Sequence, residues 1–212
     1  MNECNLVHFY GVRGSFPTYD KGKMIFGGNT SCCHLQMGSR ALVFDCGTGA
    51  VKLGQKLVSD AKSKQIDLLI SHIHFDHILG MFFFDPLKRQ DFTVNIYSED
   101  RAGMGIREQL DRIMQHPQWP VNTDGFKAQV NYHTITANAK FDLGDGLSIT
   151  TMRSNHPDIS TVFRLDYGKK SFVYTLDYEH DKDSFAELVG LCKKADFVVY
   201  DASFTDEEYQ DR

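Results

Sequence analysis

The chain has 212 residues, enough for one large domain or two small ones with a sizeable core. Its hydrophobic content of 42% and charged content of 24% are ordinary for a soluble globular protein, and its net charge is −5. Extended nucleic-acid binding is therefore not expected, because neutralising phosphates requires clustered lysine and arginine.

Apolar runs and turn residues predict strands and a few helices along the chain. Strands are expected at 6–10, 31–37, 41–46, 66–70, 92–97, 130–135, 147–152, 161–165, 172–176 and 197–200, and helices at 50–61, 106–114 and 185–192. No repeat, low-complexity tract or linker divides the sequence, so we expect a single domain over 1–212. Strand runs interrupted by few helices predict an α+β fold in which two sheets pack together with helices outside.

The densest set of metal-ligand side chains lies directly after the apolar run 66–70. Four residues form an H-x-H-x-D-H array: His72, His74, Asp76 and His77. Imidazole and carboxylate together suit zinc, manganese or iron. Because so many ligands exceed the needs of one tetrahedral ion, we expect two adjacent metals, the first two histidines on one and the remaining pair on the other. Such a pair can activate a shared water and hold both oxygens of a hydrolytic displacement. The alternative is a chance grouping of structural histidines.

Three further residues follow predicted strands and are candidates for the same site. His156 precedes a proline in a loop, and we expect a metal ligand there rather than a solvated histidine. Asp177 ends an apolar strand, where a carboxylate can bridge two cations; its alternative is a turn or helix-capping role. Asp201 also ends a strand, and its position alone leaves open a ligand, an orienting residue or a turn residue.

Cysteine usage and the absence of apolar targeting segments indicate the cell compartment. The five cysteines are odd in number and show no C-x-x-C spacing, so a disulfide framework is not expected. The opening residues show no basic stretch followed by an apolar one, and no apolar run approaches the length of a membrane span. We therefore expect a cytoplasmic protein with no membrane partner.

The order of these residues resembles the metallo-β-lactamase superfamily of dinuclear hydrolases. The H-x-H-x-D-H array, then His156, then Asp177, each after a strand, carry the resemblance. Three segments narrow it to the phosphodiesterase branch that contains ribonuclease Z and cyclic phosphodiesterases. These segments are Tyr10-Gly-Val-Arg-Gly-Ser-Phe-Pro17, Gly27-Gly-Asn-Thr-Ser-Cys32 and Phe44-Asp-Cys-Gly-Thr-Gly49. The resemblance implies an αβ/βα sandwich of two mixed β-sheets with helices on the outer faces.

The resemblance also implies a role for each candidate residue. His72, His74 and His156 would hold the first metal, and Asp76 and His77 the second. Asp177 would bridge them. Asp201 lies in a segment similar to the family's acidic motif, whose carboxylate orients a catalytic histidine.

The sequence departs from the family after Asp201. The family continues with a segment carrying the catalytic histidine and a last metal-binding histidine, whereas this sequence has no histidine after His180. Two explanations fit this missing segment. The sequence is a truncated form of a longer protein, or the protein is a degenerate member of the family. We expect truncation, because the upstream site is intact.

The function expected from these observations is a metal-dependent hydrolase with two divalent ions, zinc first and manganese or iron next. We expect a dinuclear phosphodiesterase that attacks a small cyclic or nucleotide-like phosphodiester through a metal-bridging hydroxide, with Asp76 and Asp201 catalytic. A thioester hydrolase like glyoxalase II and a non-catalytic metal-binding scaffold are the alternatives. The aromatic segment Phe82-Phe83-Phe84 is consistent with a place in the core, in the site wall or in an interface, and a homodimer is a possible assembly.

Overall fold

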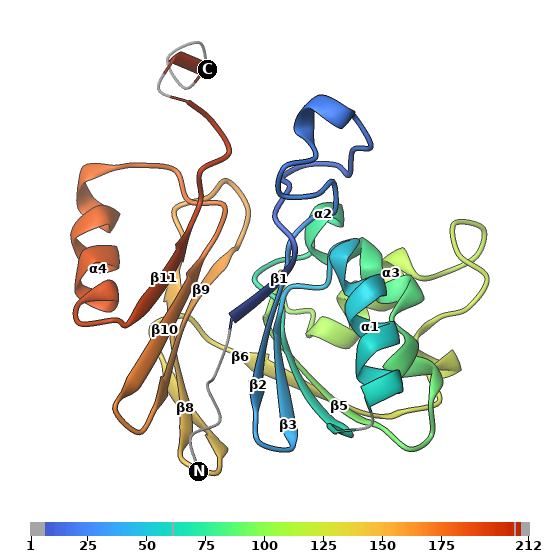
Figure 1. Ribbon diagram of the computed structural model, residues 1–212. Coiled ribbons are helices and arrows are strands. Elements are labelled where there is room, and N and C mark those ends of the chain that lie inside the picture. Colours follow the sequence, from blue (N-terminus) through green and yellow to red (C-terminus); the bar gives the residue numbers. More distant parts are fainter. Residues whose placement is uncertain (1–6, 61, 206, 209–212) are drawn as a thin grey trace. The chain divides into compact units, whose positions relative to one another are not determined.

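The computed structural model describes residues 7–60, 62–205 and 207–208 (Figure 1). It divides into two compact units, Met1–Ile135 and Thr136–Arg212. Two ends of predicted elements, Leu6 in the first strand and Ala61 in the first helix, lie outside the described residues.

The first unit contains a six-stranded mixed sheet whose strands follow one another in sequence order. These are β1 (Val7–Gly11), β2 (Cys32–Met37), β3 (Arg40–Phe44), β4 (Gln65–Leu69), β5 (Thr93–Glu99) and β6 (Gln129–Ile135). The first three strands pair antiparallel, and β3 to β6 pair parallel. Because β3 and β4 are parallel neighbours, the loops that follow them emerge at the same edge of the sheet, the usual place for ligands in such sheets.

Helices cover one face of this sheet (Figure 1). They are α1 (Gly49–Asp60), α2 (Phe75–Ile78) and α3 (Ile106–Ile113), with 3₁₀ turns at Lys21–Lys23, Leu79–Phe83, Asp85–Lys88 and Thr123–Gly125. Leu53 of α1 and Leu110 of α3 belong to one buried cluster with Ile66 and Leu68 of β4. The alternate residues of β4 point to the other face, as the period of two in a strand requires.

The aromatic segment after α2 contributes to the same core. Phe84 is fully buried there, whereas the rings of Phe82 and Phe83 lie 4.7 and 5.4 Å from the Trp119 ring. The core alternative is confirmed for Phe84, and Phe83 remains half exposed.

Two glycines allow the loop after β3 to pack directly against the segment that carries the histidine array. A β-carbon at Gly47 would lie 2.1 Å from the carbonyl oxygen of Asp76, and one at Gly80 would lie 1.9 Å from that of Gly47. The amide of Cys46 donates to the carbonyl of His77 at 2.7 Å. Only residues without a side chain permit so close a backbone approach.

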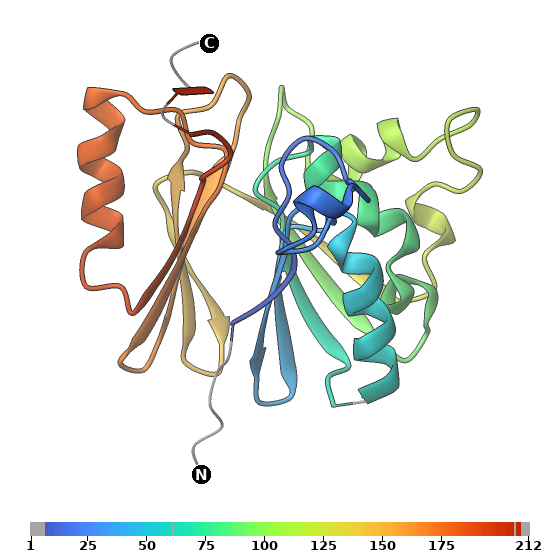
Figure 2. The ribbon, with the colours of Figure 1, turned by 45° about the horizontal axis from the view of Figure 1, so that its top comes forward.

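The second unit contains a five-stranded mixed sheet in the order β11-β10-β9-β8-β7. Its elements are β7 (Lys140–Gly144), β8 (Leu147–Arg153), β9 (Thr161–Tyr167), β10 (Lys170–Thr175), α4 (Lys182–Cys192) and β11 (Phe197–Tyr200). Among the described strands of this sheet, β10 and β11 pair parallel and the other neighbours pair antiparallel. Figures 1 and 2 both show α4 along one face of this sheet, where Leu188 packs against Met152, Val162 and Val173.

The predicted fold class is confirmed, since both sheets are mixed, and helices cover a face of the first sheet while α4 covers a face of the second. One strand was not predicted: β7 alternates exposed Lys140, Asp142 and Gly144 with only two apolar residues, too few for an apolar run. Within the described part of the chain, every helix is too short or too polar to cross a membrane.

Candidate metal centre

The histidine array follows β4 at the edge where the β3 and β4 loops emerge. Its first residue, His72, lies in the loop, and α2 begins three residues later with Asp76 in its first turn. The side chains of His72 and His77 are fully buried, whereas those of His74 and Asp76 are partly exposed. All four predicted ligands of this unit therefore lie within six consecutive residues after β4.

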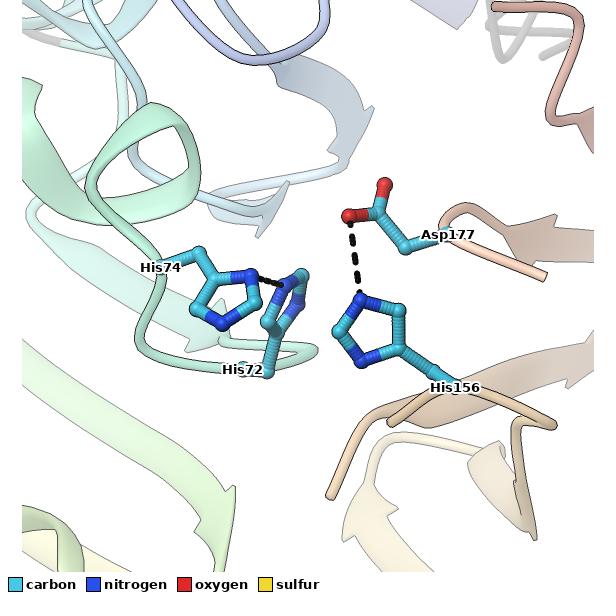
Figure 3. A group of neighbouring side chains, drawn as sticks. All are labelled: His72, His74, His156 and Asp177. Atoms are coloured by element: carbon cyan, nitrogen blue, oxygen red, sulfur yellow. Dashed lines mark hydrogen bonds and ion pairs between the residues drawn. The ribbon is translucent and has the colours of Figure 1, made fainter. Parts of the chain in front are cut away.

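The first two histidines direct one nitrogen each toward a common point. His72 Nε2 lies 2.9 Å from His74 Nδ1, and Figure 3 shows these two ring atoms facing each other. Two imidazole nitrogens on one tetrahedral zinc ion are about 3.3 Å apart, given zinc–nitrogen distances of roughly 2.05 Å. The observed spacing is about 0.4 Å shorter than this, so the two nitrogens are close enough to share a divalent ion after a small ring movement. Neutral imidazole is the ligand form that such ions require.

Asp76 and His77 form a second pair of donors in the same unit. His77 Nε2 lies 3.4 Å from Asp76 Oδ2. The same carboxylate oxygen accepts a hydrogen bond of 2.8 Å from the backbone amide of Ser15, whose φ of 64° is in the left-handed region. The N-terminal segment thus fixes the orientation of the Asp76 side chain.

Asp45 and Ser71 contact the histidines of the array. The sequence did not lead us to assign either residue to the site. Asp45 Oδ2 lies 2.7 Å from His77 Nδ1, and Asp45 Oδ1 accepts a 2.8 Å hydrogen bond from the Ser71 amide. The Ser71 hydroxyl lies 2.9 Å from Asp45 Oδ1 and 3.1 Å from His72 Nδ1. A signal for Asp45 was present, because it ends an apolar strand as Asp177 does.

Cys46 lies next to Asp45 but is not suited to bind metal. Burial, followed by the neighbouring Asp45 carboxylate, raises the pKa of the Cys46 thiol far above its ordinary value. Metal ions bind the thiolate rather than the thiol. The candidate metal donors at this edge of the sheet are therefore carboxylate and imidazole.

The second unit places its two predicted ligands close to each other. His156 Nε2 lies 3.8 Å from Asp177 Oδ2 (Figure 3). His156 Nδ1 lies 3.1 Å from the carbonyl oxygen of Asp158, so the other ring nitrogen faces the carboxylate. Asp177 follows β10 with a φ of 50°, and its carbonyl accepts a 2.7 Å hydrogen bond from the Ser154 hydroxyl.

Asp201 follows β11 and fixes the loop that carries Asp177. Its carboxylate accepts hydrogen bonds from the Ser203 amide at 2.9 Å and hydroxyl at 2.7 Å, and from the Tyr178 amide at 3.3 Å. Its predicted role of orienting a catalytic histidine stays a prediction.

Comparison with known sequences identifies the family. The family model described as a beta-lactamase superfamily domain matches residues 40–211. Ribonuclease Z from Archaeoglobus fulgidus is 26% identical over 96 residues, which are 43% of this chain and 28% of that protein. Ribonuclease Z from Natronomonas pharaonis is 29% identical over 127 residues, which are 56% of this chain and 37% of that protein. The chain thus spans less than two fifths of the length of these relatives.

Comparison with solved structures agrees on the fold. The short form of human tRNase Z superimposes with a TM-score of 0.66 at 20% sequence identity, covering 97% of this chain and 80% of that chain. At this identity the likeness establishes the fold alone. From the family model and this shared fold, we conclude that the chain belongs to the β-lactamase superfamily and adopts the metallo-β-lactamase fold.

Proposed function

We propose that this protein is a metal-dependent hydrolase with two divalent ions, and that it acts as a phosphodiesterase. The observation that carries the proposal is the paired arrangement of the donor atoms, His72 with His74 and Asp76 with His77. His72, His74 and His156 would hold one ion, Asp76 and His77 the other, and Asp177 both. Zinc is our first choice, with manganese or iron next, because His/Asp sites accept several metals.

In this proposal some site residues bind the metal ions, and others orient the water or the ligands. Divalent ions of this class, when bound, polarise a phosphoryl oxygen and acidify water. Asp76 Oδ2 is held by the Ser15 amide, which leaves this carboxylate in a fixed position to accept a hydrogen bond from the attacking water. Fixed orientation of the nucleophile lowers the entropic part of the barrier. Asp201 accepts a hydrogen bond from the Tyr178 amide, next to Asp177. In this proposal Asp201 holds the loop that carries Asp177 in place.

The substrate we propose is a small cyclic or nucleotide-like phosphodiester. Both curated relatives are ribonucleases, which supports the phosphodiester class. The net charge of −5 favours a small substrate over a long nucleic acid, which a basic surface would bind. We also propose that the protein is cytoplasmic and that it forms a homodimer.

The proposal is tested by turnover of a panel that contains cyclic nucleotides, linear nucleotide diesters and a thioester. The zinc- and manganese-loaded proteins are compared with Asp76→Asn, which keeps the size of the side chain and an oxygen that can accept from the Ser15 amide. We expect phosphodiester turnover in the wild type and a loss of about 10²- to 10⁴-fold in the variant. Turnover of the thioester without any phosphodiester would contradict the substrate class, and equal rates in the variant would contradict the role of Asp76.

A further inference from the structure

We infer that Arg13 and Phe16 recognise a nucleotide beside the candidate metal centre. The guanidinium of Arg13 binds a phosphate group of the substrate, and the ring of Phe16 stacks on its base. Neither residue is among the candidate metal ligands. The inference deepens the proposed function and rests on it for the reaction, but the binding of a nucleotide to these two residues can be measured without metal.

Both residues lie in the segment between β1 and β2 that contacts Asp76. The backbone amide of Ser15 donates to Asp76 Oδ2 at 2.8 Å, and Arg13 and Phe16 lie on either side of Ser15 in the chain. Figures 1 and 2 both show this segment beside α2, the helix that carries Asp76. Because consecutive Cα atoms are about 3.8 Å apart, the Cα atom of Arg13 lies no more than about 7.6 Å from that of Ser15. Both side chains therefore begin close to the candidate site.

Hydrogen bonds fix the backbone at both positions. The Arg13 amide donates to the carbonyl oxygen of Asn29 at 3.0 Å, which ties the segment to the start of the next strand. The Phe16 amide donates to the carbonyl oxygen of Gly14 at 2.8 Å, which closes a three-residue turn around Ser15. Residues that are already fixed lose less conformational entropy when a ligand binds. The two side chains are thus attached to a preorganised backbone.

The guanidinium of Arg13 has no protein acceptor among the residues that the structure describes. Its Nε atom is buried and makes no hydrogen bond to any of them. The sequence has more acidic than basic residues, 28 against 23, and four other arginines each pair with an aspartate: Arg40, Arg89, Arg107 and Arg164. A buried donor without an acceptor is unfavourable, and the planar guanidinium fits two oxygens of one phosphate. Arg13 is therefore available to bind an anionic group of a ligand.

The side chain of Phe16 supplies the second part of the recognition. Phe16 is 63% exposed although its backbone is fixed by the turn around Ser15. A single exposed apolar side chain is ordinary on a protein surface. Here, however, the ring lies three residues from an unpaired guanidinium and one residue from the contact to Asp76. Bases stack on aromatic side chains whatever their sequence, so a phosphate-binding group and a ring match the two parts of a nucleotide better than they match an apolar protein surface.

The direct test is a titration of the metal-free protein with AMP, followed by NMR of the arginine Nε–H groups. We expect the Nε–H resonance of Arg13, assigned from its absence in Arg13→Lys, to shift on binding. Arg13→Gln should weaken AMP about 10-fold or more. Phe16→Ala should weaken AMP about 5- to 50-fold and leave the affinity for inorganic phosphate unchanged. Phe16→Tyr keeps a ring and should restore the affinity for AMP.

Arg112→Gln is the matched control for the arginine. Arg112 is an exposed arginine of the same unit, on α3, and among the described residues it too forms no ion pair. Its replacement should leave the binding of AMP unchanged. An Arg13 resonance that AMP does not shift, or equal effects of Arg13→Gln and Arg112→Gln, would overturn the inference.

Turnover by the zinc-loaded protein tests the same residues in the proposed reaction. Arg13→Gln should raise the KM for a dinucleotide about 10- to 100-fold with little change in kcat, because the phosphate is bound equally in the ground state and the transition state. A dinucleotide with a 5′-phosphate is compared with one without it. A KM effect confined to the first would place the guanidinium on a second phosphate of the substrate, and an equal effect on both would place it on the reacting phosphate.

The outcomes separate this inference from the proposed function. If AMP shifted Arg13 but the metal-loaded protein hydrolysed no phosphodiester, the proposed function would fail while the nucleotide site stood. If the protein hydrolysed dinucleotides with the same KM in wild type and Arg13→Gln, the inference would be overturned and the proposed function would stand. A changed oligomeric state in Phe16→Ala with unaltered AMP affinity would assign the ring to a protein interface and overturn its stacking role.

Discussion

The two units hold their candidate ligands in different ways. In the first unit, four ligands come from six consecutive residues, and two of these, His72 and His77, are fully buried against Asp45 and Ser71. In the second unit, His156 and Asp177 come from separate loops. They are partly exposed. His156 Nδ1 contacts the backbone of Asp158, and His156 Nε2 lies 3.8 Å from Asp177 Oδ2.

This difference indicates which candidate ligands keep their positions before a metal binds. A dense array braced by a buried carboxylate keeps its geometry without a metal, because each ring has a fixed partner. Donors on loops have fewer buried contacts and open at lower free energy. We therefore expect the first unit to be preorganised and the second to gain order when metal binds.

The largest expected effect comes from Gly47→Ala in the first unit. The added β-carbon would lie 2.1 Å from the carbonyl oxygen of Asp76, a backbone atom that cannot move alone. We expect a loss of about 3 kcal/mol in the free energy of unfolding, together with loss of metal binding. Chemical unfolding and zinc titration measure both.

Gly190→Ala in α4 is the control for that substitution, because a β-carbon there meets no atom within 4 Å. Alanine should stabilise this helix by up to about 1 kcal/mol. Equal effects of the two glycine substitutions would show that the close approach at Gly47 is absent in solution.

Replacing one histidine in each unit sharpens the comparison. His72→Ala removes a fully buried ring and leaves the Ser71 hydroxyl without this partner, so we expect about 2 kcal/mol of lost stability in the metal-free protein. His156→Ala should cost less than about 1 kcal/mol, while both variants lose metal affinity. Thermal unfolding with a chelator and zinc titration separate the two effects, and a larger loss for His156→Ala would contradict a preorganised first unit.

The sequence predicted most of the fold and the candidate metal ligands, but not the residues that contact those ligands. The apolar runs located ten of the strands, because buried strands need continuous or alternating apolar residues, and the H-x-H-x-D-H spacing indicated metal chemistry. It missed β7, whose outward residues are polar. It also missed Asp45 and Ser71, since their role depends on contacts between residues 26 apart in the sequence.

A further variant, Arg164→Met, tests how the second unit is held together. The guanidinium bonds to Asp166 and donates to the carbonyl oxygens of Leu191 and Lys193 at 2.6 and 3.0 Å, which satisfies the end of α4. Charged hydrogen bonds of this kind contribute about 1.5 to 3 kcal/mol. We expect roughly 2 kcal/mol of lost stability, measured by chemical unfolding of the metal-free protein. An unchanged free energy of unfolding would show that these hydrogen bonds do not stabilise the second unit.

The smallest expected effect is a pH dependence in the first unit. Burial raises the pKa of Asp67, against the opposing hydrogen bond from Asn95 and the charge of Arg40. The native state therefore binds this proton more tightly than the unfolded state. The stability that this proton contributes is complete below the ordinary aspartate pKa and is lost as pH rises through the raised value.

Asp67→Asn should remove this slope. We expect the free energy of unfolding of the wild type minus that of the variant to fall as the pH rises above the ordinary aspartate pKa. Urea unfolding of the metal-free proteins over a series of pH values measures it. A difference that rises with pH would show that the Arg40 ion pair, at 3.3 Å, outweighs burial.

Metal stoichiometry of the purified chain, after loading with zinc and with manganese separately, tests the central proposal most directly. Elemental analysis should find two tightly held ions per chain, and His72→Ala and Asp76→Asn should each hold fewer. No bound ion in the folded wild-type protein would contradict a metal-dependent hydrolase built on these residues.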